Sequence, residues 1–312
     1  MTLHSRSALV LAAVGCLASA APLQETSKQV TTVAEPQTGV RLELSGPQQP
    51  TYVWAASEWT LKFDNRSTED LPCTLDVLEP AGRGGARVSF EIAKDGKTVR
   101  SFSSRSFDLS SNCGGVGKSE VIAPGASAEL PVVLHGEMHF DLEAYARDEE
   151  VYTRFEPAFE TPGAYTVTAV LRWKASTIRS NSIALDVGDA PAGCKRAREE
   201  LAELAKAGLC IDVQGMYTNQ PWAKLERIAD FVEREKHTLY GAQLQIGLAQ
   251  ALFWILQADS GCDVSRLRPP GVTVTLERVK SLLTPMPPFD VGLDRTFGLL
   301  REAVAKQERE SR

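Results

Sequence analysis

The stretch TPGAYTVTAVLRWKASTIRSNSIALDV, residues 161–187, alternates apolar and polar residues over two successive segments. The apolar residues of the first segment share one side of an extended chain: Tyr165, Val167, Ala169, Leu171 and Trp173. After a polar turn, Ile183, Leu185 and Val187 repeat the alternation. A period of two over this length predicts two strands, each with one buried face. We interpret the stretch as the closing hairpin of an antiparallel β-sandwich.

The same alternation recurs upstream and predicts a β domain over residues 40–188. It appears at 40–44, 59–63, 88–92 and 130–134, with Asp95-Gly96 as a turn between two alternating segments. Asp-Gly is a strong hairpin signal because both residues tolerate positive φ. Pro131 cannot donate to a β-ladder, so its strand is expected at a sheet edge. With the closing hairpin this makes roughly seven to nine strands, which is the size of a two-sheet sandwich.

The pattern becomes helical after the linker 189–193, which indicates an α-helical domain over residues 194–309. Apolar residues recur at a spacing of three to four from Cys194 to Leu204, with Gly208 as the expected stop. Further helices are expected after Asn219, over Leu239–Gln257, near Leu276–Leu283 and from Leu293 onward, and the end of the third is apolar all round. The fold class is therefore a β domain followed by a helical domain. We expect two separate cores with no reactive pocket between them.

The N-terminus resembles an export signal. His4 and Arg6 precede an apolar run at 8–17, and Ala18-Ser19-Ala20 supplies small residues for cleavage, so residues 1–20 are a predicted signal peptide. A competing interpretation is a lipoprotein box in which Cys16 is lipidated. Residues 21–39 are polar and predict a disordered leader. No later transmembrane segment is expected, and the protein should be exported to the periplasm, the outer envelope or the medium.

The cysteines left after removal of Cys16 predict disulfides, since export permits them. We expect Cys73–Cys113 within the β domain. In the helical domain Cys262 could pair with Cys194 or Cys210, and we expect Cys210–Cys262. Cys194 and Cys210 bracket a helix and would lie about 24 Å apart, against a limit of about 7 Å for a disulfide. One thiol is then left over, buried or intermolecular. The alternative is that all of these cysteines are small core residues.

The candidate metal ligands are His135, Glu137 and His139. In an extended chain they share the outward face, and the two histidines would be about 13 Å apart, so one ion could bind at most a neighbouring pair unless Gly136 bends the chain. Surface polar residues are the simpler interpretation. Asn112–Ser119 resembles a phosphate-binding loop but lacks the first glycine and the following helix. We therefore expect no cofactor, and Asn65-Arg66-Ser67 is a glycosylation acceptor in form only.

Four short runs together carry a resemblance to a known class of domain. They are Ile122–Gly125, Leu130–Leu134, Pro162–Tyr165 and Ser180–Ile183. They resemble the second half of Ig-like domains in exported bacterial proteins, in which a tyrosine hydroxyl after a corner bonds back to the nearby backbone. The resemblance covers roughly a fifth of the chain and implies an N-terminal Ig-like β-sandwich. It transfers no functional residue.

The formal net charge of −6 argues against a nucleic-acid surface, which requires clustered Lys and Arg. The chain contains no GxSxG elbow and only four histidines. The favoured hypothesis is a non-enzymatic envelope or secreted protein that binds another protein. The alternatives are a protease inhibitor that acts through Gly-rich loops and a metal-dependent hydrolase that uses His135, Glu137 and His139.

Overall fold

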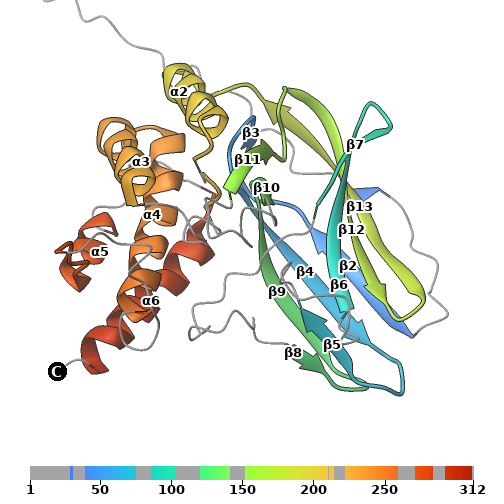
Figure 1. Cartoon of the computed structure of the whole chain (residues 1–312). Coiled ribbons are helices and arrows are strands. Elements are labelled where there is room, and N and C mark those ends of the chain that lie inside the picture. The colour runs from blue at the N-terminus through green and yellow to red at the C-terminus, as the bar shows by residue number, and fades with distance from the viewer. Residues whose placement is uncertain are drawn as a thin grey trace, which may run out of the picture.

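The computed structural model describes residues 29–30, 39–74, 86–102, 120–140, 152–209, 211–213, 222–258, 271–283 and 292–310. The N-terminal part is rich in strands and is followed by helices (Figure 1). The strands are β1 (Gln29–Val30), β2 (Val40–Ser45), β3 (Thr51–Tyr52), β4 (Ser57–Asn65), β5 (Leu71–Thr74), β6 (Ala86–Lys94), β7 (Lys97–Phe102), β8 (Glu120–Ile122), β9 (Ser127–Leu134), β10 (Gly136–Phe140), β11 (Tyr152–Pro157), β12 (Gly163–Trp173) and β13 (Ser176–Gly188). The helices are α2 (Lys195–Lys206), α3 (Trp222–Glu235), α4 (Leu239–Ala258), α5 (Leu276–Leu282) and α6 (Asp294–Glu310).

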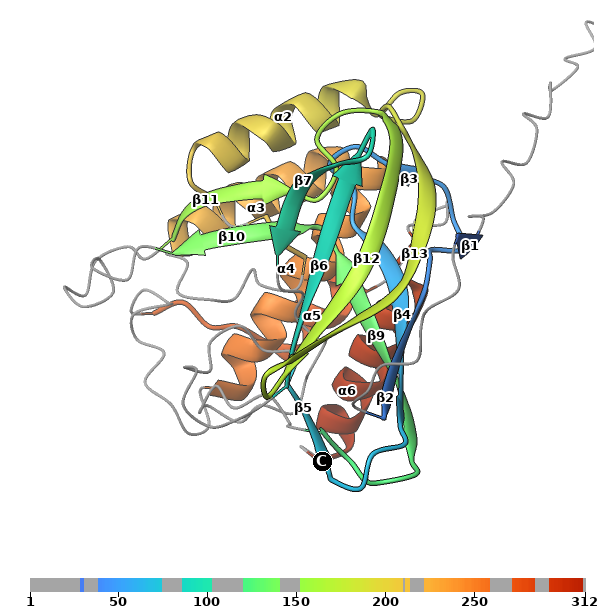
Figure 2. The same ribbon diagram turned by 90° about the vertical axis from the view of Figure 1, so that its right-hand side faces the viewer.

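The described strands form three open sheets. The largest has the order β1-β13-β12-β6-β5-β8, with β3 added to β13 and β7 added to β6. A second sheet has the order β2-β4-β9, and β10 pairs with β11 in a third. Figure 2 shows β6, β12 and β13 side by side, with the β10–β11 pair beneath α2. Pro131 lies on β9 at the edge of its sheet, as its missing N–H predicts.

The closing hairpin is confirmed as β12 paired with β13. Antiparallel pairing runs from Gly163–Val187 to Trp173–Ser176. Tyr165 and Trp173 are both buried. The turn at Asp95-Gly96 is also confirmed, because both residues have positive φ, 51° and 74°. In both hairpins the local pattern of residues was enough to predict the pairing.

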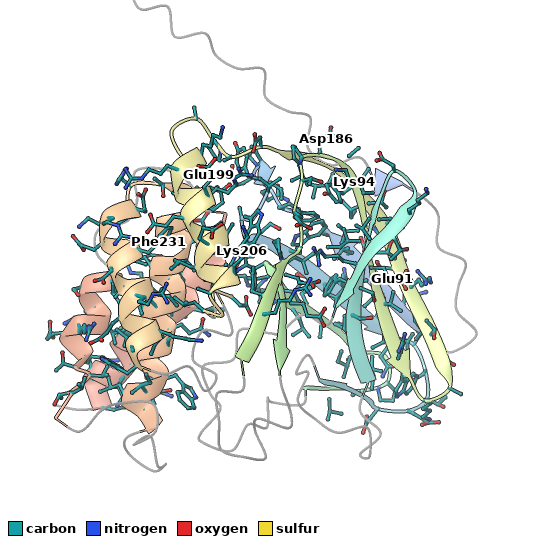
Figure 3. The ribbon with its side chains drawn as sticks, turned by 45° about the horizontal axis from the view of Figure 1, so that its top comes forward. Glu91, Lys94, Asp186, Glu199, Lys206 and Phe231 are labelled. Carbon is teal, nitrogen blue, oxygen red and sulfur yellow. The ribbon has the colours of Figure 1, made fainter. Side chains whose placement is uncertain are left out.

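The two larger sheets bury their apolar faces in one cluster. Trp59 and Phe63 from β4 meet Phe90 from β6 and Leu171 from β12 there. The outer face of the larger sheet carries polar residues such as Glu91 on β6, which Figure 3 labels. Glu91 accepts two hydrogen bonds from the Arg179 guanidinium, at 2.7 and 2.9 Å. The sheets thus have one apolar and one solvated face, as the alternation predicts.

The helices begin and end close to the predicted positions. Gly208, with a φ of 71°, follows α2 and lets the chain turn out of the helix. Phe231 of α3 points into the core, whereas Glu199 and Lys206 lie on the outer side of α2 (Figure 3). Leu239–Gln257 is long and apolar enough to cross a membrane by length and composition alone, but 83% of it is buried inside the fold. That burial is what a core helix of a globular part requires.

The core of the helical part does not stop at the helices. Its apolar cluster includes Ala55, Ala56, Val133 and Phe155, which belong to the strand-rich part. Trp54 packs against both clusters. Two cores were expected and two buried clusters are present, but the cluster of the helices extends into the strand-rich part. The strand-rich part and the helices therefore share a buried junction.

The predicted disordered leader differs from the structure at one point. Gln29 and Val30 form β1, which pairs with Ile183 and Ser182 of β13. A strand at the edge of a sheet offers unpaired backbone groups that a short polar segment can bond, whatever its composition. The signal peptide at 1–20 and Cys16 lie outside the described residues.

Candidate functional site

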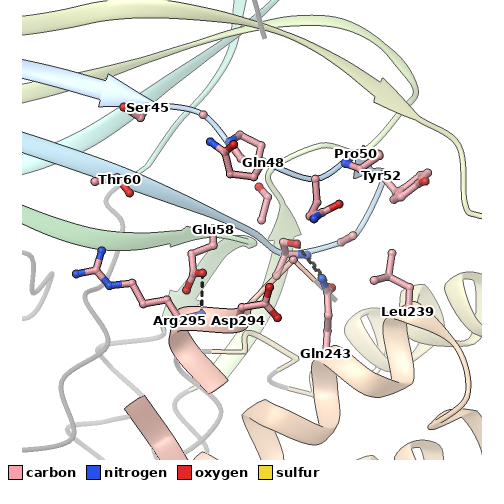
Figure 4. Close-up of a pocket in the computed structure, with 17 residues that line it drawn as sticks. Ser45, Gln48, Pro50, Tyr52, Glu58, Thr60, Leu239, Gln243, Asp294 and Arg295 are labelled. Atoms are coloured by element: carbon pink, nitrogen blue, oxygen red, sulfur yellow. Dashed lines mark hydrogen bonds between the residues drawn. The ribbon is translucent and has the colours of Figure 1, made fainter. Parts of the chain in front are cut away.

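A pocket of about 500 Å³ lies at the junction between the strands and the helices. Its walls come from the loop that follows β2, from the start of β4 and from the first residues of α4 and α6 (Figure 4). The floor contains Ala55, Ala56 and Ser57, and these three small side chains leave the space open. We expected no reactive pocket between the two parts; the structure places a pocket at this junction, which the sequence patterns did not reveal.

The floor of the pocket is fixed by Gln243 of α4. Its Oε1 accepts a hydrogen bond from the Ala56 N–H at 2.9 Å, and its Nε2 donates to the Ala56 carbonyl at 2.8 Å. Both residues are buried, and they are 187 positions apart in the chain. The amide therefore bonds the backbone as a neighbouring strand would and satisfies two buried groups at once.

The side wall is fixed by Glu58 of β4, which caps α6. Its Oε1 accepts hydrogen bonds from the Thr296 N–H at 2.8 Å and the Thr296 hydroxyl at 2.6 Å. Its Oε2 accepts from the Arg295 N–H at 3.1 Å (Figure 4). The first N–H groups of a helix have no partner within the helix, and a carboxylate there also suits the helix dipole. Glu58 thus joins the strands to the last helix.

The rim of the pocket is polar. Gln48 and Gln49 are exposed on the loop after β2, between Pro47 and Pro50. Arg295 is exposed at the start of α6. Pro47 and Pro50 fix their own φ on either side of the two glutamines. The pocket combines a small, rigid floor with hydrogen-bonding groups at its edge.

A strained turn lies behind the floor. The Ala55 N–H donates to the Tyr52 carbonyl at 3.2 Å, and Trp54 within this turn has a φ of 63°. Positive φ is unfavourable for a large side chain, so the surrounding contacts must hold it. The Tyr240 hydroxyl donates to the Val53 carbonyl at 2.8 Å and is buried. Burial raises the pKa of the Tyr240 hydroxyl well above its ordinary value.

His135 is not a surface residue, and the expectation of an outward face is wrong there. Only 3% of it is exposed, and its ring packs 4.9 Å from that of Phe155, centre to centre. Its Nδ1 accepts a hydrogen bond from the Val213 N–H at 3.2 Å and lies 3.6 Å from the Asp212 Oδ1. The side of the chain opposite Leu134 is covered by the segment after α2, which periodicity cannot reveal.

Of the other two candidate ligands, only Glu137 has a side chain that the structure describes. Glu137 is half-buried on β10, and the backbone of His139 pairs with Arg154 of β11. The His139 side chain lies outside what the structure describes. Among the described residues, no group of three or more His, Cys, Asp or Glu could hold a metal ion.

Asn65 is a structural residue in spite of its acceptor motif. It is fully buried, and its Nδ2 donates to the carbonyls of Glu69 at 2.9 Å and Ile122 at 2.7 Å. Its Oδ1 accepts from the Ser67 N–H and hydroxyl. A side chain that closes a loop in this way has no amide free for modification.

The predicted disulfides fall outside the described residues. This holds for the side chain of Cys73 and for Cys113, Cys210 and Cys262. Cys194 is a free, buried cysteine. The resemblance to a phosphate-binding loop at 112–119 also falls outside the described part. Sequence reasoning missed Gln243 and Glu58, because nothing local marks a partner so far along the chain.

The comparisons with known proteins assign no family. No family model matches the chain, and no curated protein matches it. Among solved structures, the human CEP192 PapD-like domain 7 is 13% identical, at a TM-score of 0.20, with 54% of this chain and 99% of that domain covered. Salmonella alpha-2-macroglobulin is 11% identical, at a TM-score of 0.26, with 79% of this chain and 18% of that chain covered. TM-scores this low decide neither fold nor function, so a function has to be inferred from the junction pocket.

Proposed function

We propose that the protein is an exported, non-enzymatic binding protein whose junction pocket holds a segment of another protein. In this proposal the strand-rich part is an Ig-like sandwich, and the helices complete its binding site. The observation that carries the proposal is the pocket itself. It has a floor built by contacts between distant parts of the chain and a rim with two exposed amide side chains.

The Ig-like assignment is supported by the corner before β12. The Tyr165 hydroxyl donates to the Thr161 carbonyl at 2.7 Å, four residues upstream. This is the kind of backbone contact that the tyrosine corner of such domains makes. The common apolar cluster of the two larger sheets also supports the assignment. Loops at the end of a rigid scaffold are frequent binding sites.

The size and construction of the pocket favour binding. Its volume of about 500 Å³ lies within the range of about 300–1,000 Å³ typical of ligand sites. The side chain of Gln243 and the carboxylate of Glu58 are already held by backbone groups, so they need not be ordered when a partner binds. A preformed site loses less conformational entropy on binding than a mobile one does.

Site-specific photo-crosslinking tests the proposal in the producing cells. A photo-reactive residue at Gln49 should yield a discrete protein adduct, whereas the same residue at Glu91, on the outer face of the large sheet, should not. Mass spectrometry of the adduct names the partner. The proposal fails if Gln49 gives no adduct, or if both positions give the same adducts in equal yield.

A further inference from the structure

The junction pocket lies where two neighbouring strands separate. β2 pairs with β4 as far as Ser45, which lies opposite Thr60. Beyond Ser45 the chain leaves β4 and continues as the loop that lines the pocket with Gln48 and Gln49. Figure 4 shows Gln48 of this loop on one side of the pocket and Glu58 of β4 on the other. The pocket therefore lies beside the part of β4 that β2 does not reach.

The backbone groups of Glu58 point toward the pocket. In an antiparallel ladder, successive residues direct their N–H and carbonyl alternately to the two sides of the strand, and the ladder between β4 and β9 has no register shift. The Asn65 N–H donates to the Ala126 carbonyl at 2.9 Å, just before β9, so the odd-numbered residues of β4 point to that side. Pro131 of β9, which has no N–H to exchange, accordingly lies opposite the even-numbered Thr60. Glu58 therefore directs its N–H and carbonyl to the other side, where the pocket lies.

The positions on either side of Glu58 along this edge already have partners. Ala56 is two residues earlier and points to the same side, and the Gln243 amide bonds both its N–H and its carbonyl, at 2.9 and 2.8 Å. Thr60 is two residues later and lies opposite Ser45 of β2. Within the described part of the chain, no strand or loop backbone bonds Glu58 on this side. One backbone donor and one backbone acceptor thus remain open at the pocket.

We propose that the bound partner segment is extended and pairs its backbone with Glu58 as a short added strand. This inference rests on the proposed function and specifies how the partner is recognised. One partner residue donates its N–H to the Glu58 carbonyl and accepts a hydrogen bond from the Glu58 N–H. In strand addition such main-chain bonds supply affinity, and side chains supply specificity. The edge from Ala56 to Thr60 is about 13 Å long, which is room for about three partner residues.

Amide hydrogen exchange of the full native chain tests the open edge before any partner is added. The Lys62 N–H is the matched control, because it points to the same side of β4 but lies opposite Glu43 of β2. Relative to their intrinsic rates, we expect the Glu58 N–H to exchange at least about tenfold faster than the Lys62 N–H. Equal protection of the two amides would overturn the inference, because Glu58 would then already have a partner.

The probe for binding is a display library of random 12-residue peptides selected on the full chain. Only peptides that crosslink to a photo-reactive residue at Gln49 are kept, which restricts them to the pocket. A kept peptide should slow exchange of the Glu58 N–H. Methylation of one backbone nitrogen in that peptide should weaken binding about tenfold to a hundredfold, because the Glu58 carbonyl loses its donor. Methylation of an adjacent nitrogen, which points away from β4, should leave binding unchanged.

The opposing outcomes separate this inference from the proposed function. If a kept peptide leaves exchange at Glu58 unchanged, or tolerates methylation at every backbone nitrogen, the inference is overturned and the proposed function stands. If no peptide both binds and crosslinks to Gln49, the result counts against the proposed function, and the inference falls with it.

Discussion

Replacing Gln243 with methionine tests whether the junction depends on one amide side chain. Methionine has a similar length and volume, so packing against the floor of the pocket changes little. What is lost is the pair of hydrogen bonds to the N–H and carbonyl of Ala56, at 2.9 and 2.8 Å. Only 4% of Ala56 is exposed, so water does not replace the lost partners.

The loss of stability can be worked out from the N–H and carbonyl of Ala56, which lose their hydrogen-bond partners. Leaving a buried polar group without a partner costs about 1–3 kcal/mol, which makes about 2–6 kcal/mol for the pair. Removing the amide from the fold also removes its own desolvation cost, so we expect a loss of about 2–4 kcal/mol in the free energy of unfolding. With a urea m-value of about 3 kcal/mol/M, the midpoint should fall by about 1 M.

Gln250→Met is the matched control, two turns further along α4. Gln250 is 4% exposed, and its Oε1 has no hydrogen-bond partner among the described residues. The same substitution should therefore leave stability unchanged or raise it, because it removes an unsatisfied acceptor. Urea unfolding followed by tryptophan fluorescence compares the two variants. Equal losses for Gln243→Met and Gln250→Met would refute the reasoning.

The variant Gln243→Glu should make the stability of the folded chain depend on pH, because the new side chain can be charged or neutral. At neutral pH the carboxylate can accept from the Ala56 N–H but cannot donate to the carbonyl, and it places a charge in a buried site. Burial should raise the pKa of this carboxyl in the folded chain, so the folded state binds the proton more tightly than the unfolded state. The stability of this variant relative to the native chain should therefore increase as the pH falls.

Further outcomes are expected for three residues, Tyr240, Glu58 and Asn65. Burial raises the pKa of Tyr240, whereas an unfolded tyrosine releases its proton near pH 10. Alkaline pH should therefore lower the free energy of unfolding, and Tyr240→Phe should weaken this dependence. Glu58→Gln keeps one acceptor oxygen but points an amide at the Arg295 N–H, so thermal unfolding should report a loss of about 1–2 kcal/mol. Asn65→Asp removes two buried donors and should cost about 2–4 kcal/mol in a urea titration; native Asn65 should stay unmodified in a glycosylating host by intact-mass measurement.

The secondary structure was predictable where one period runs along the chain. The alternation at 165–173 and the turn at Asp95-Gly96 depend only on neighbouring residues, so β12, β13 and the β6–β7 turn could be predicted from them. The helix at 239–257 was predictable for the same reason. Its apolar run indicated the buried centre of the helical part, and the structure buries it.

The junction was not predictable from these patterns. Periodicity assigned His135 to the face opposite Leu134 but could not tell whether that face meets water or another part of the chain. The contact between Ala56 and Gln243 spans 187 positions and leaves no trace in the residues around either one. The one available signal was Gln243 itself, a glutamine in an apolar helix, because a buried amide requires hydrogen-bond partners.

The cap that Glu58 provides for α6 has a consequence for biosynthesis. Arg295 is made 237 residues after Glu58. At about 5–20 residues per second, the ribosome needs roughly 10–50 s to cover that distance. Throughout this interval Glu58 lacks its partners on α6, and the wall of the pocket stays incomplete. Under the proposed function, a nascent or truncated polypeptide that ends before residue 294 should not bind the partner segment.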